Sequence, residues 1–307
     1  MDLRQLEVFV SVVDHKSFSA AAEELRLSQP TVSIHIRALE QEFQTRLIRR
    51  TTRLFALTDA GAKLYHYAVS ILNIQRKALQ ELSDQNKREL HIGASSVPGQ
   101  CLLPEIMVNF HKISPDTPFL VTSTDSGDVI QRVLEGALDV GFVGVKTDVA
   151  CKFVPIASDE LIVAVPNTEH YRALLRNKVS LRRLLREPMI LRTERSGTMQ
   201  EIEGFLHRMG ISLEELQVVA QINDSELLRF CIVQGLGISI LSRRMVEDFI
   251  RQERILAVPL GEESLVRHLY MIYREDDYMP DLIKLFVDSV KTSFGTEISA
   301  SCEDVGE

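Results

Sequence analysis

Apolar residues recur every three or four positions in three successive segments at the start of the chain, a spacing typical of amphipathic helices. The first stripe consists of Leu3, Leu6, Val10 and Val13. The second follows Ser17 and contains Ala20, Ala21 and Leu25. The third follows the favourable N-cap Ser28, has Pro30 in its first turn, and contains Val32, Ile36, Leu39 and Phe43. We therefore expect the chain to begin with three helices that pack through these stripes.

The third predicted helix presents an unusual outward face. At about 100° per residue, the surface opposite its apolar stripe contains Pro30, Ser33, Ile34, Arg37 and Gln41, with Thr31 at the exposed first turn. Small hydroxyls, an amide, one apolar side chain and an arginine suit the edges of bases in a major groove. A merely polar, solvated surface is the alternative interpretation.

A cluster of four arginines follows the third helix. Residues 46–57 alternate enough to predict a two-stranded wing, and no acidic residue interrupts its cluster of Arg46, Arg49, Arg50 and Arg53. In such a wing these side chains would lie along the phosphate backbone beside the groove.

A seven-residue repeat begins after Thr58, which is a candidate N-cap. The repeat alternates spacings of four and three through Leu64, Ala68, Ile71, Gln75, Ala78 and Leu82. Such a heptad seam favours a dimerisation helix, with packing on its own chain as the alternative. The candidate dimerisation residues are Leu64, Ala68, Ile71, Gln75 and Leu82. The charged stretch 83–89 is the predicted linker.

The pattern changes at Leu90, from which short apolar runs alternate with helical segments. The predicted strands are 90–94, 118–124, 138–144, 161–165, 189–192, 217–222, 237–241, 255–258 and 267–273. Helices among them include 104–111, 129–135, 197–209 and 226–234. This order implies an α/β fold with open parallel sheets flanked by helices, in which ligands bind at the carboxyl ends of the strands.

Polar residues occupy three of these strand-to-helix junctions. They are Ser95 and Ser96 after the first strand, Thr124 after the second, and Ser196, Gly197 and Thr198 after the fifth. Hydroxyls and backbone N–H groups at helix starts favour an anionic or polar ligand. Ordinary helix capping is the alternative for any one of them. The prediction of a ligand site therefore depends on the recurrence of hydroxyls at three equivalent junctions.

Composition places the chain among ordinary globular proteins, with 45% hydrophobic and 25% charged residues over 307 positions and two or three expected domains. No uncharged apolar run reaches the roughly 18 to 20 residues that span a bilayer, and acidic residues interrupt the apolar N-terminus. We expect a cytoplasmic protein with no membrane partner. The four cysteines lie far apart without a CxxC pair, so no metal site, disulfide framework or cofactor is predicted.

Charge is distributed unevenly along the chain. The net charge is −8, yet the first 65 residues contain nine Lys or Arg against eight Asp or Glu, which gives +1 and leaves −9 for the remainder. The arginine cluster is therefore a local positive patch on an acidic protein.

The N-terminal motifs together resemble those of the LysR-type transcriptional regulators. The matching stretches are F-x-x-V, S-F-S-A-A-A-E-x-L, S-Q-P-T-V-S, I-x-x-L-E and R-T-x-R-x-x-x-L-T-x-A-G. The EGALDVGFVG and QGLGISILS stretches are more loosely similar to the effector domain of the family. In one departure, Phe43, Gln44 and Thr45 stand where the family has a leucine-glycine pair before the wing.

The resemblance implies a winged helix-turn-helix over 1–58, a linker and dimerisation helix with a hinge over 59–89, and a two-lobed sensor similar to periplasmic binding proteins over 90–294. Lobe one would comprise 90–160 and 268–294, lobe two 161–267, and 295–307 would be a disordered tail. The implied partners are double-stranded promoter DNA, a small-molecule effector and further copies of the chain, as a homodimer or homotetramer. The candidate DNA contacts are Ser28, Gln29, Pro30, Thr31, Ser33, Ile34 and Arg37 on the helix, with Arg50 and Arg53 in the wing.

Two other classes of function compete with this interpretation. An enzyme or solute-binding protein could use the same two-lobed fold, but the sequence has no GxSxG, P-loop, HExxH or dinucleotide fingerprint. A thiol-based redox sensor is the other alternative, suggested by Cys101 and Cys231. Neither cysteine has a neighbouring cationic pair or resolving cysteine in the sequence, so structural thiols are favoured.

Overall fold

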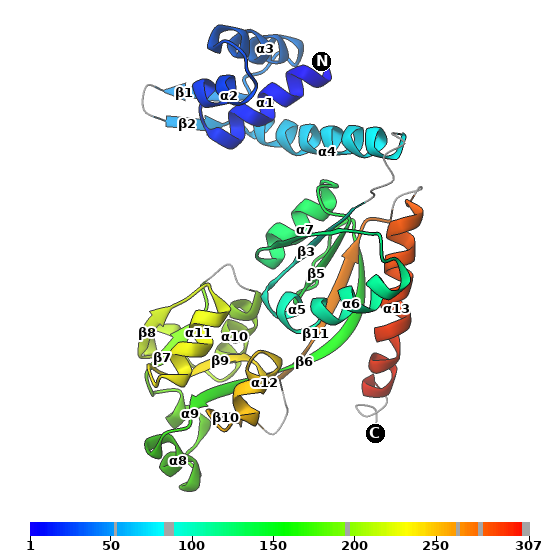
Figure 1. Cartoon of the computed structure of the whole chain (residues 1–307). Helices are drawn as coiled ribbons and strands as arrows, with labels where there is room; N and C mark the ends of the chain where they lie inside the picture. The colour runs from blue at the N-terminus through cyan, green and yellow to red at the C-terminus, as the bar shows by residue number, and fades with distance from the viewer. Residues whose placement is uncertain (52–53, 83–88, 194–196, 262–264, 276–278, 303–307) are drawn as a thin grey trace. The chain divides into compact units, whose positions relative to one another are not determined.

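The computed structural model describes residues 1–51, 54–82, 89–193, 197–261, 265–275 and 279–302 (Figure 1). The chain divides into two compact units, one made of residues 1–88 with 134–137 and the other of residues 89–133 with 138–307. Among the described residues, no helix is both long and apolar enough to cross a membrane.

The first unit contains three short helices, a two-stranded hairpin and one long helix. The helices are α1 (Leu3–His15), α2 (Phe18–Glu24) and α3 (Gln29–Glu42), and the long helix is α4 (Asp59–Leu82). Strands β1 (Ile48–Thr51) and β2 (Leu54–Leu57) pair antiparallel and form the predicted wing. The apolar stripes of the three helices meet in one core, in which Phe9 is fully buried.

Two side chains of α3 lie differently from the helical projection. Ser33 is buried, because α3 packs against both α1 and α2 and the apolar stripe is wider than one line of residues. Phe43, predicted at the end of the buried stripe, is 42% exposed, because α3 ends at Glu42 and Phe43 is its C-cap. Val32, Ile36 and Leu39 form the buried stripe as predicted.

The turn from α3 into the wing forms without the glycine that the family usually has there. Gln44 adopts the left-handed conformation, with φ of +49°, which glycine enters without steric cost. The wing is then fixed to α3 by Glu40, whose Oε1 accepts hydrogen bonds from the backbone N–H of Leu47 at 3.0 Å and of Ile48 at 3.4 Å.

The second unit is built on a seven-stranded sheet and a separate two-stranded sheet. The large sheet has the order β10-β6-β11-β5-β3-β4, with β9 also paired to β6. Its strands are β3 (Leu90–Ala94), β4 (Phe119–Ser123), β5 (Val140–Val143), β6 (Lys152–Pro166), β9 (Ser239–Ser242), β10 (Ile255–Pro259) and β11 (Leu265–Tyr273). The small sheet pairs β7 (Met189–Leu191) with β8 (Val218–Gln221).

The prediction of open parallel sheets is correct for only part of the strands. Strand β3 is parallel to β4 and β5, and β7 to β8, whereas β6, β9, β10 and β11 form antiparallel pairs. The error has a local cause. Strand β6 is 15 residues long, and its first half contains Pro155 and the polar run Ser158–Glu160, so only its apolar second half was predicted as a strand.

The two long strands β6 and β11 divide this unit into two lobes. The first half of β6 pairs with β11, whose other neighbour is β5, and the second half of β6 pairs with β9 and β10. We call the part around β3, β4 and β5 lobe one and the part around β7, β8, β9 and β10 lobe two. In Figure 1 both long strands run from one lobe into the other.

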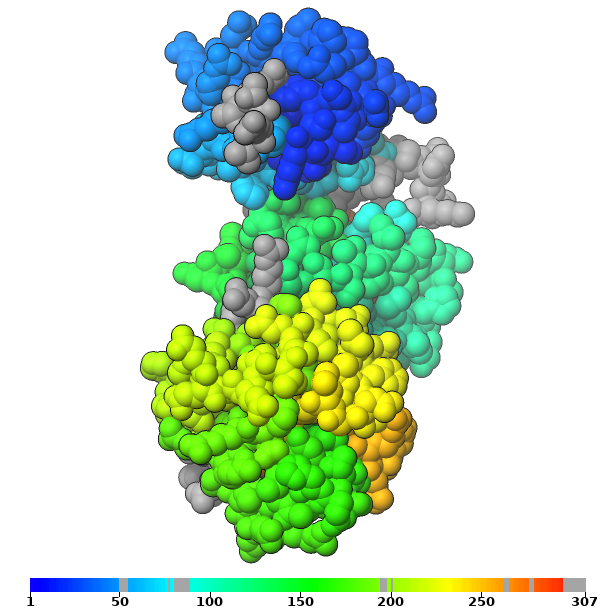
Figure 2. Space-filling model, turned by 90° about the vertical axis from the view of Figure 1, so that its left-hand side faces the viewer, coloured from blue at the N-terminus to red at the C-terminus, as the bar shows by residue number. Residues whose placement is uncertain are grey.

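Helices cover the sheets of both lobes. Lobe one has α5 (Ser96–Cys101), α6 (Leu103–Ile113), α7 (Ser126–Leu134) and α13 (Asp281–Cys302), and the Phe110 and Phe286 rings of α6 and α13 meet edge to face at 5.0 Å. Lobe two has α8 (Glu169–Arg176), α9 (Leu181–Leu184), α10 (Gly197–Arg208), α11 (Ser225–Val233) and α12 (Arg243–Arg251), with a short 3-10 turn at Leu213–Glu215. Figure 2 shows α11, in yellow, on the outer surface of lobe two.

Helix α13 extends further than predicted. It continues through Cys302 and so includes residues 295–302, the first part of the segment expected to be a disordered tail. A single glycine, Gly295, costs a helix only about 1 kcal/mol, and no proline follows it before Cys302.

Candidate functional site

The exposed face of α3 contains most of the predicted DNA contacts. Ile34 is 62% exposed although it is a large apolar residue, and Gln29, Pro30 and Arg37 are exposed around it. Buried Ser33 does not belong to this face. The remaining exposed side chains therefore offer an amide, a guanidinium and an apolar group on successive turns of one helix face.

The N-terminus of α3 is fixed by its own hydroxyls. Ser28 Oγ accepts a hydrogen bond from the Thr31 backbone N–H at 3.2 Å and lies 2.7 Å from Thr31 Oγ1. Part of the bonding capacity of both side chains is thus used within the helix. The first turn is held in a defined geometry, with Gln29 and Pro30 exposed on it.

The wing is described only in part. Arg49 is exposed, and Arg46 is exposed while Nη1 donates to Glu40 Oε2 at 2.8 Å. Arg53 and the side chain of Arg50, both predicted to contact phosphates, lie outside the described residues.

Helix α4 uses the first part of its predicted seam within its own chain. Ala68 is fully buried, and Leu64 and Ile71 pack partly buried against the same core as α1. Gln75 is half-buried, and the side chain of Leu82 lies outside the described residues. Among the described side chains of α4, the large apolar residues that are exposed are Tyr67, Ile74 and Leu79, and Ala78 of the predicted repeat is exposed as well. Ala68 is therefore covered by its own chain, whereas Leu64 and Ile71 are covered only in part and their role in dimerisation stays a prediction.

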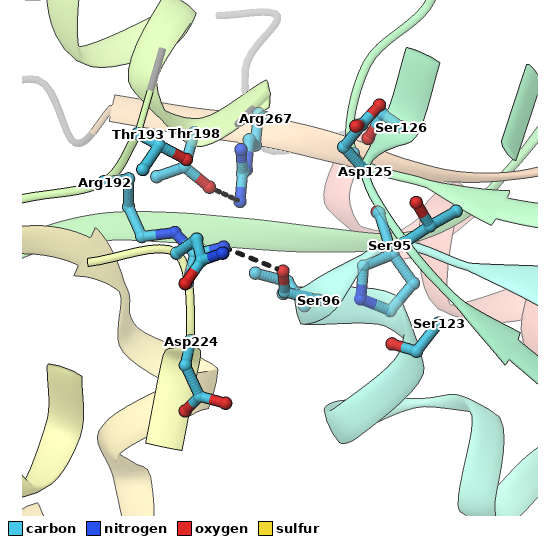
Figure 3. A pocket seen from close by; sticks show the side chains of 15 residues that line it. Ser95, Ser96, Ser123, Asp125, Ser126, Arg192, Thr193, Thr198, Asp224 and Arg267 are labelled. Carbon is cyan, nitrogen blue, oxygen red and sulfur yellow. Dashed lines mark hydrogen bonds between the residues drawn. The ribbon is translucent and has the colours of Figure 1, made fainter. Parts of the chain in front are cut away.

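A polar cavity of about 450 Å³ lies between the two lobes of the second unit (Figure 3). Four of the predicted effector residues line it, namely Ser95, Ser96, Thr124 and Thr198. Ser196 lies outside the described residues, and Gly197 begins α10 directly before Thr198. The remaining lining residues are Val97, Pro98, Ser123, Asp125, Ser126, Gly144, Arg192, Thr193, Asn223, Asp224 and Arg267.

Two arginines of this cavity are absent from the effector residues predicted from the sequence. Arg192 follows the last residue of β7, and Arg267 lies within β11. Arg192 is the last residue of the predicted strand 189–192 and Arg267 the first residue of the predicted strand 267–273, and a cation at the boundary of an apolar run was the signal available in the sequence. The partners of the two side chains depend on residues far away in the chain, which no local pattern identifies.

Arg192 connects the two lobes through hydroxyls. Its Nη1 donates to Ser225 Oγ of lobe two at 2.7 Å, and its Nη2 donates to Ser96 Oγ of lobe one at 3.0 Å, as the dashed line in Figure 3 shows for Ser96. Burial lowers the pKa of the Arg192 guanidinium, and the nearby carboxylate of Asp224 partly opposes that shift. The group remains charged, because an arginine side chain is not deprotonated in proteins.

Arg267 is held by a buried carboxylate. Its Nε donates to Asp159 Oδ2 at 2.9 Å, with the two side chains 7% and 0% exposed, and its Nη2 donates to Thr198 Oγ1 at 3.3 Å. Asp159 Oδ1 accepts a further hydrogen bond from Ser242 Oγ at 2.5 Å. Because Asp159 and Arg267 face each other in the β6-β11 ladder, this ion pair lies where the chain passes between the lobes.

Three helices of eight or more residues begin at the cavity wall. Asp125 and Ser126 stand at the start of α7, Thr198 is the second residue of α10, and Asp224 is the N-cap of α11. Helix N-termini present unpaired N–H groups and partial positive charge, which favour anions. Two of these helix N-termini carry a carboxylate, that of Asp125 or of Asp224, so both cationic and anionic side chains line the cavity.

Cys101 lies at the end of α5, and burial, followed by the nearby charge of Asp159, raises the pKa of its thiol to about 11. At neutral pH it is therefore a thiol and not the reactive thiolate. Among the described residues, no group of three or more His, Cys, Asp or Glu side chains could hold a metal ion.

Family models match both parts of the chain. Residues 3–62 match the bacterial regulatory helix-turn-helix protein family of LysR type, and residues 83–295 match the LysR substrate binding domain. The chain is 28% identical over 297 residues to the transcriptional regulator CysL of Bacillus subtilis, covering 95% of this chain and 98% of that protein. It is 30% identical over 287 residues to the uncharacterised transcriptional regulator YeiE of Escherichia coli, covering 93% and 96%.

Solved structures give the same fold. CbnR, a LysR family transcriptional regulator, superposes with a TM-score of 0.66 at 22% identity, covering 96% of this chain and 99% of that one. CbnR in complex with its target DNA superposes with a TM-score of 0.64 at 23% identity, covering 95% and 100%.

Proposed function

The chain belongs to the LysR family of helix-turn-helix transcription regulators, and we propose from this membership how its parts divide the work of binding DNA, sensing an effector and assembling. It is a DNA-binding regulator with an effector-binding domain. The proposed limits are 1–58 for the DNA-binding domain, 59–89 for the linker and 90–294 for the sensor. We place its action in the cytoplasm, where promoter DNA is accessible.

The exposed face of α3 is proposed to read base edges in the major groove, with Gln29, Thr31, Ile34 and Arg37 as the contacts. The wing arginines, including Arg50 and Arg53, would hold the phosphate backbone beside it. Phosphate contacts fix position and base contacts fix sequence, so the two groups have separable effects. The support is the exposure of this face together with its fixed first turn.

The cavity between the lobes is proposed to bind a small anionic or polar effector. The observation that carries this proposal is the convergence of two arginines, three helix N-termini and a ring of hydroxyls on one cavity of about 450 Å³. A ligand shifts a conformational equilibrium only through its different affinities for the two states. An effector that contacts both lobes meets this requirement, because its contacts change when the lobes move.

Assembly into homodimers or homotetramers is proposed to use the exposed side of α4. Tyr67 and Ile74, two turns apart on one face of the helix, are uncovered in the single chain, and LysR regulators are oligomeric. A second copy of the chain is therefore the partner that we assign to this side of the helix.

Thermal unfolding against a panel of inorganic and organic anions tests the effector proposal. An anion at about 100 times its dissociation constant adds about 2.7 kcal/mol to the free energy of unfolding. A gel shift with the DNA upstream of its own gene, with and without each stabilising anion, tests regulation. If no anion stabilises the protein and none changes the gel shift, the effector is not an anion.

A further inference from the structure

We propose that Arg192 recognises the charge of the effector, and that Ser96 and Ser225 are positioning residues that hold its guanidinium across the two lobes. The inference rests on the proposed effector function and narrows the ligand class. It assigns a compact oxyanion, either a carboxylate or a tetrahedral oxoanion, whose charged end lies against Arg192.

The two arginines of the cavity are not equivalent. Arg267 already has a counter-ion, since Asp159 lies 2.9 Å from its Nε and is completely buried. An effector that drew Arg267 away would leave the Asp159 carboxylate buried and unpaired, which is strongly unfavourable. Arg267 therefore holds the connecting strands together through Asp159, and it is a poor candidate for binding the charge of a ligand.

Arg192 has neutral partners. Within the part of the chain that the structure describes, its guanidinium donates to the hydroxyls of Ser225 and Ser96, and no carboxylate oxygen lies within 4.0 Å of its nitrogens. Burial has nevertheless removed water from the guanidinium, as the lowered pKa of Arg192 indicates. A charged group that is desolvated but not ion-paired gains more from an anion than one that already has a counter-ion.

Arg192 can donate to the two serine hydroxyls and to an oxyanion at the same time. A guanidinium has five N–H donors in a planar fork, and two of its nitrogens reach hydroxyls here, so donors remain for a bidentate oxyanion. A serine oxygen that accepts from arginine keeps its own O–H to donate. Ser96 and Ser225 can thus orient Arg192 and, in addition, donate to a ligand that lies beside it.

The arrangement also couples occupancy to the lobes. Arg192 follows β7 in lobe two, while Ser96 begins α5 in lobe one (Figure 3). The same guanidinium is therefore bonded to lobe one and exposed to the cavity. A ligand that takes up its remaining donors changes the strength of the bond between lobes, which is the differential contact that regulation requires.

The test is calorimetric titration of the full-length protein with sodium acetate and, separately, sodium sulfate at constant ionic strength. Arg192→Gln is compared with Arg186→Gln, an exposed arginine of the same lobe that gives a matched loss of charge. We expect Arg192→Gln to weaken anion binding at least tenfold and Arg186→Gln to leave it unchanged. The stronger of the two anions identifies carboxylate or tetrahedral recognition.

The positioning role has its own readout. Ser96→Ala should weaken binding three- to tenfold, Ser96→Thr should restore it, and Ser96→Ala combined with Arg192→Gln should bind no more weakly than Arg192→Gln alone. If the parent binds an anion and Arg192→Gln binds it within threefold of the parent, this inference is wrong while the proposed effector function stands. If the parent binds neither anion, the assignment of a compact oxyanion is wrong, whereas the proposed effector function is decided separately by the wider panel of anions and the gel shift.

Discussion

At the scale of single residues, the buried pair of Arg267 and Asp159 ties the two lobes together at their connecting strands. We expect Asp159→Ala to lower the free energy of unfolding by about 3 to 5 kcal/mol, because it leaves the Arg267 cation buried without a counter-ion. Urea unfolding followed by circular dichroism measures the effect. The control is Glu247→Ala, which removes the partner of largely exposed Arg251 and should cost less than about 1 kcal/mol. Equal losses in the two variants would contradict the structural role of the buried pair.

The thiol of Cys101 should react slowly with alkylating reagents in the native protein. Its pKa is raised from 9.0 to about 11, so at pH 8 the thiolate fraction falls from about one in ten to about one in a thousand. Since the thiolate is the nucleophile, we expect alkylation of Cys101 by iodoacetamide to be about 100-fold slower in the native than in the unfolded chain, and to accelerate up to about pH 11. Peptide mass spectrometry follows the site. Rapid native labelling at pH 7 would revive the redox-sensor hypothesis.

Arg37 and Arg49 should differ in the kind of DNA binding that they support. Both are exposed, the first on α3 and the second on the wing strand β1. Arg37→Ala should reduce binding to the target sequence by about 1 to 3 kcal/mol and leave nonspecific binding nearly unchanged. Arg49→Ala should weaken both and reduce the salt slope by about one. Gel shifts at several salt concentrations distinguish them, and identical salt-dependent losses would exclude base reading by Arg37.

At the scale of elements, α4 has two apolar sides with different roles. Ile71 packs against the core of the first unit, whereas Ile74 is 54% exposed. We expect Ile74→Glu to dissociate the oligomer and leave the melting temperature of the separated chain unchanged, while Ile71→Glu should destabilise the fold itself by placing a charge against the core. Light scattering and thermal unfolding of the two variants provide the measurement. An unchanged oligomer for Ile74→Glu would remove this side of α4 from the interface.

The elements that the sequence predicts well are those whose signals are local. The stripes of α1 and α3, the Ser28 cap and the arginine-rich wing each depend on residues within a few turns of one another. The first half of β6 could not be predicted, because Pro155 interrupts it and its place beside β11 depends on a strand more than 100 residues later. The heptad pattern of α4 was a correct sign of apolar packing, but the pattern does not distinguish a partner on the same chain from a second copy.

The candidate cavity shows the same division between local and distant signals. Hydroxyls at the starts of helices follow from strand-to-helix order, and Ser96 and Thr198 do line one cavity. Their bonds to Arg192 and Arg267 join residues 96 and 69 positions apart, so no local pattern reveals them. Alanine at either hydroxyl is therefore expected to act on effector binding through an arginine as well as directly.

At the scale of the whole molecule, binding of effector and of promoter DNA must influence each other equally. If an effector changes the dissociation constant for promoter DNA tenfold, DNA must change the dissociation constant for the effector tenfold in the same direction. Calorimetric titration of the stabilising anion into the protein, alone and saturated with promoter DNA, measures this factor. Unequal factors would mean that a further equilibrium, such as assembly of copies, is linked to one of the two binding steps.

The ribbon formed by β6 and β11 also restricts how the lobes can move. Its ladder runs from Leu265 opposite Leu161 to Tyr273 opposite Lys152, with one irregularity between Leu269 and Tyr270. Sliding one strand along the other would break every bond of the ladder at once, whereas twisting or bending a two-stranded ribbon preserves them. The soft coordinate of the sensor is therefore a rotation about the ribbon. An effector that binds between the lobes can therefore change only the angle between them, and this angle is the signal that the sensor transmits.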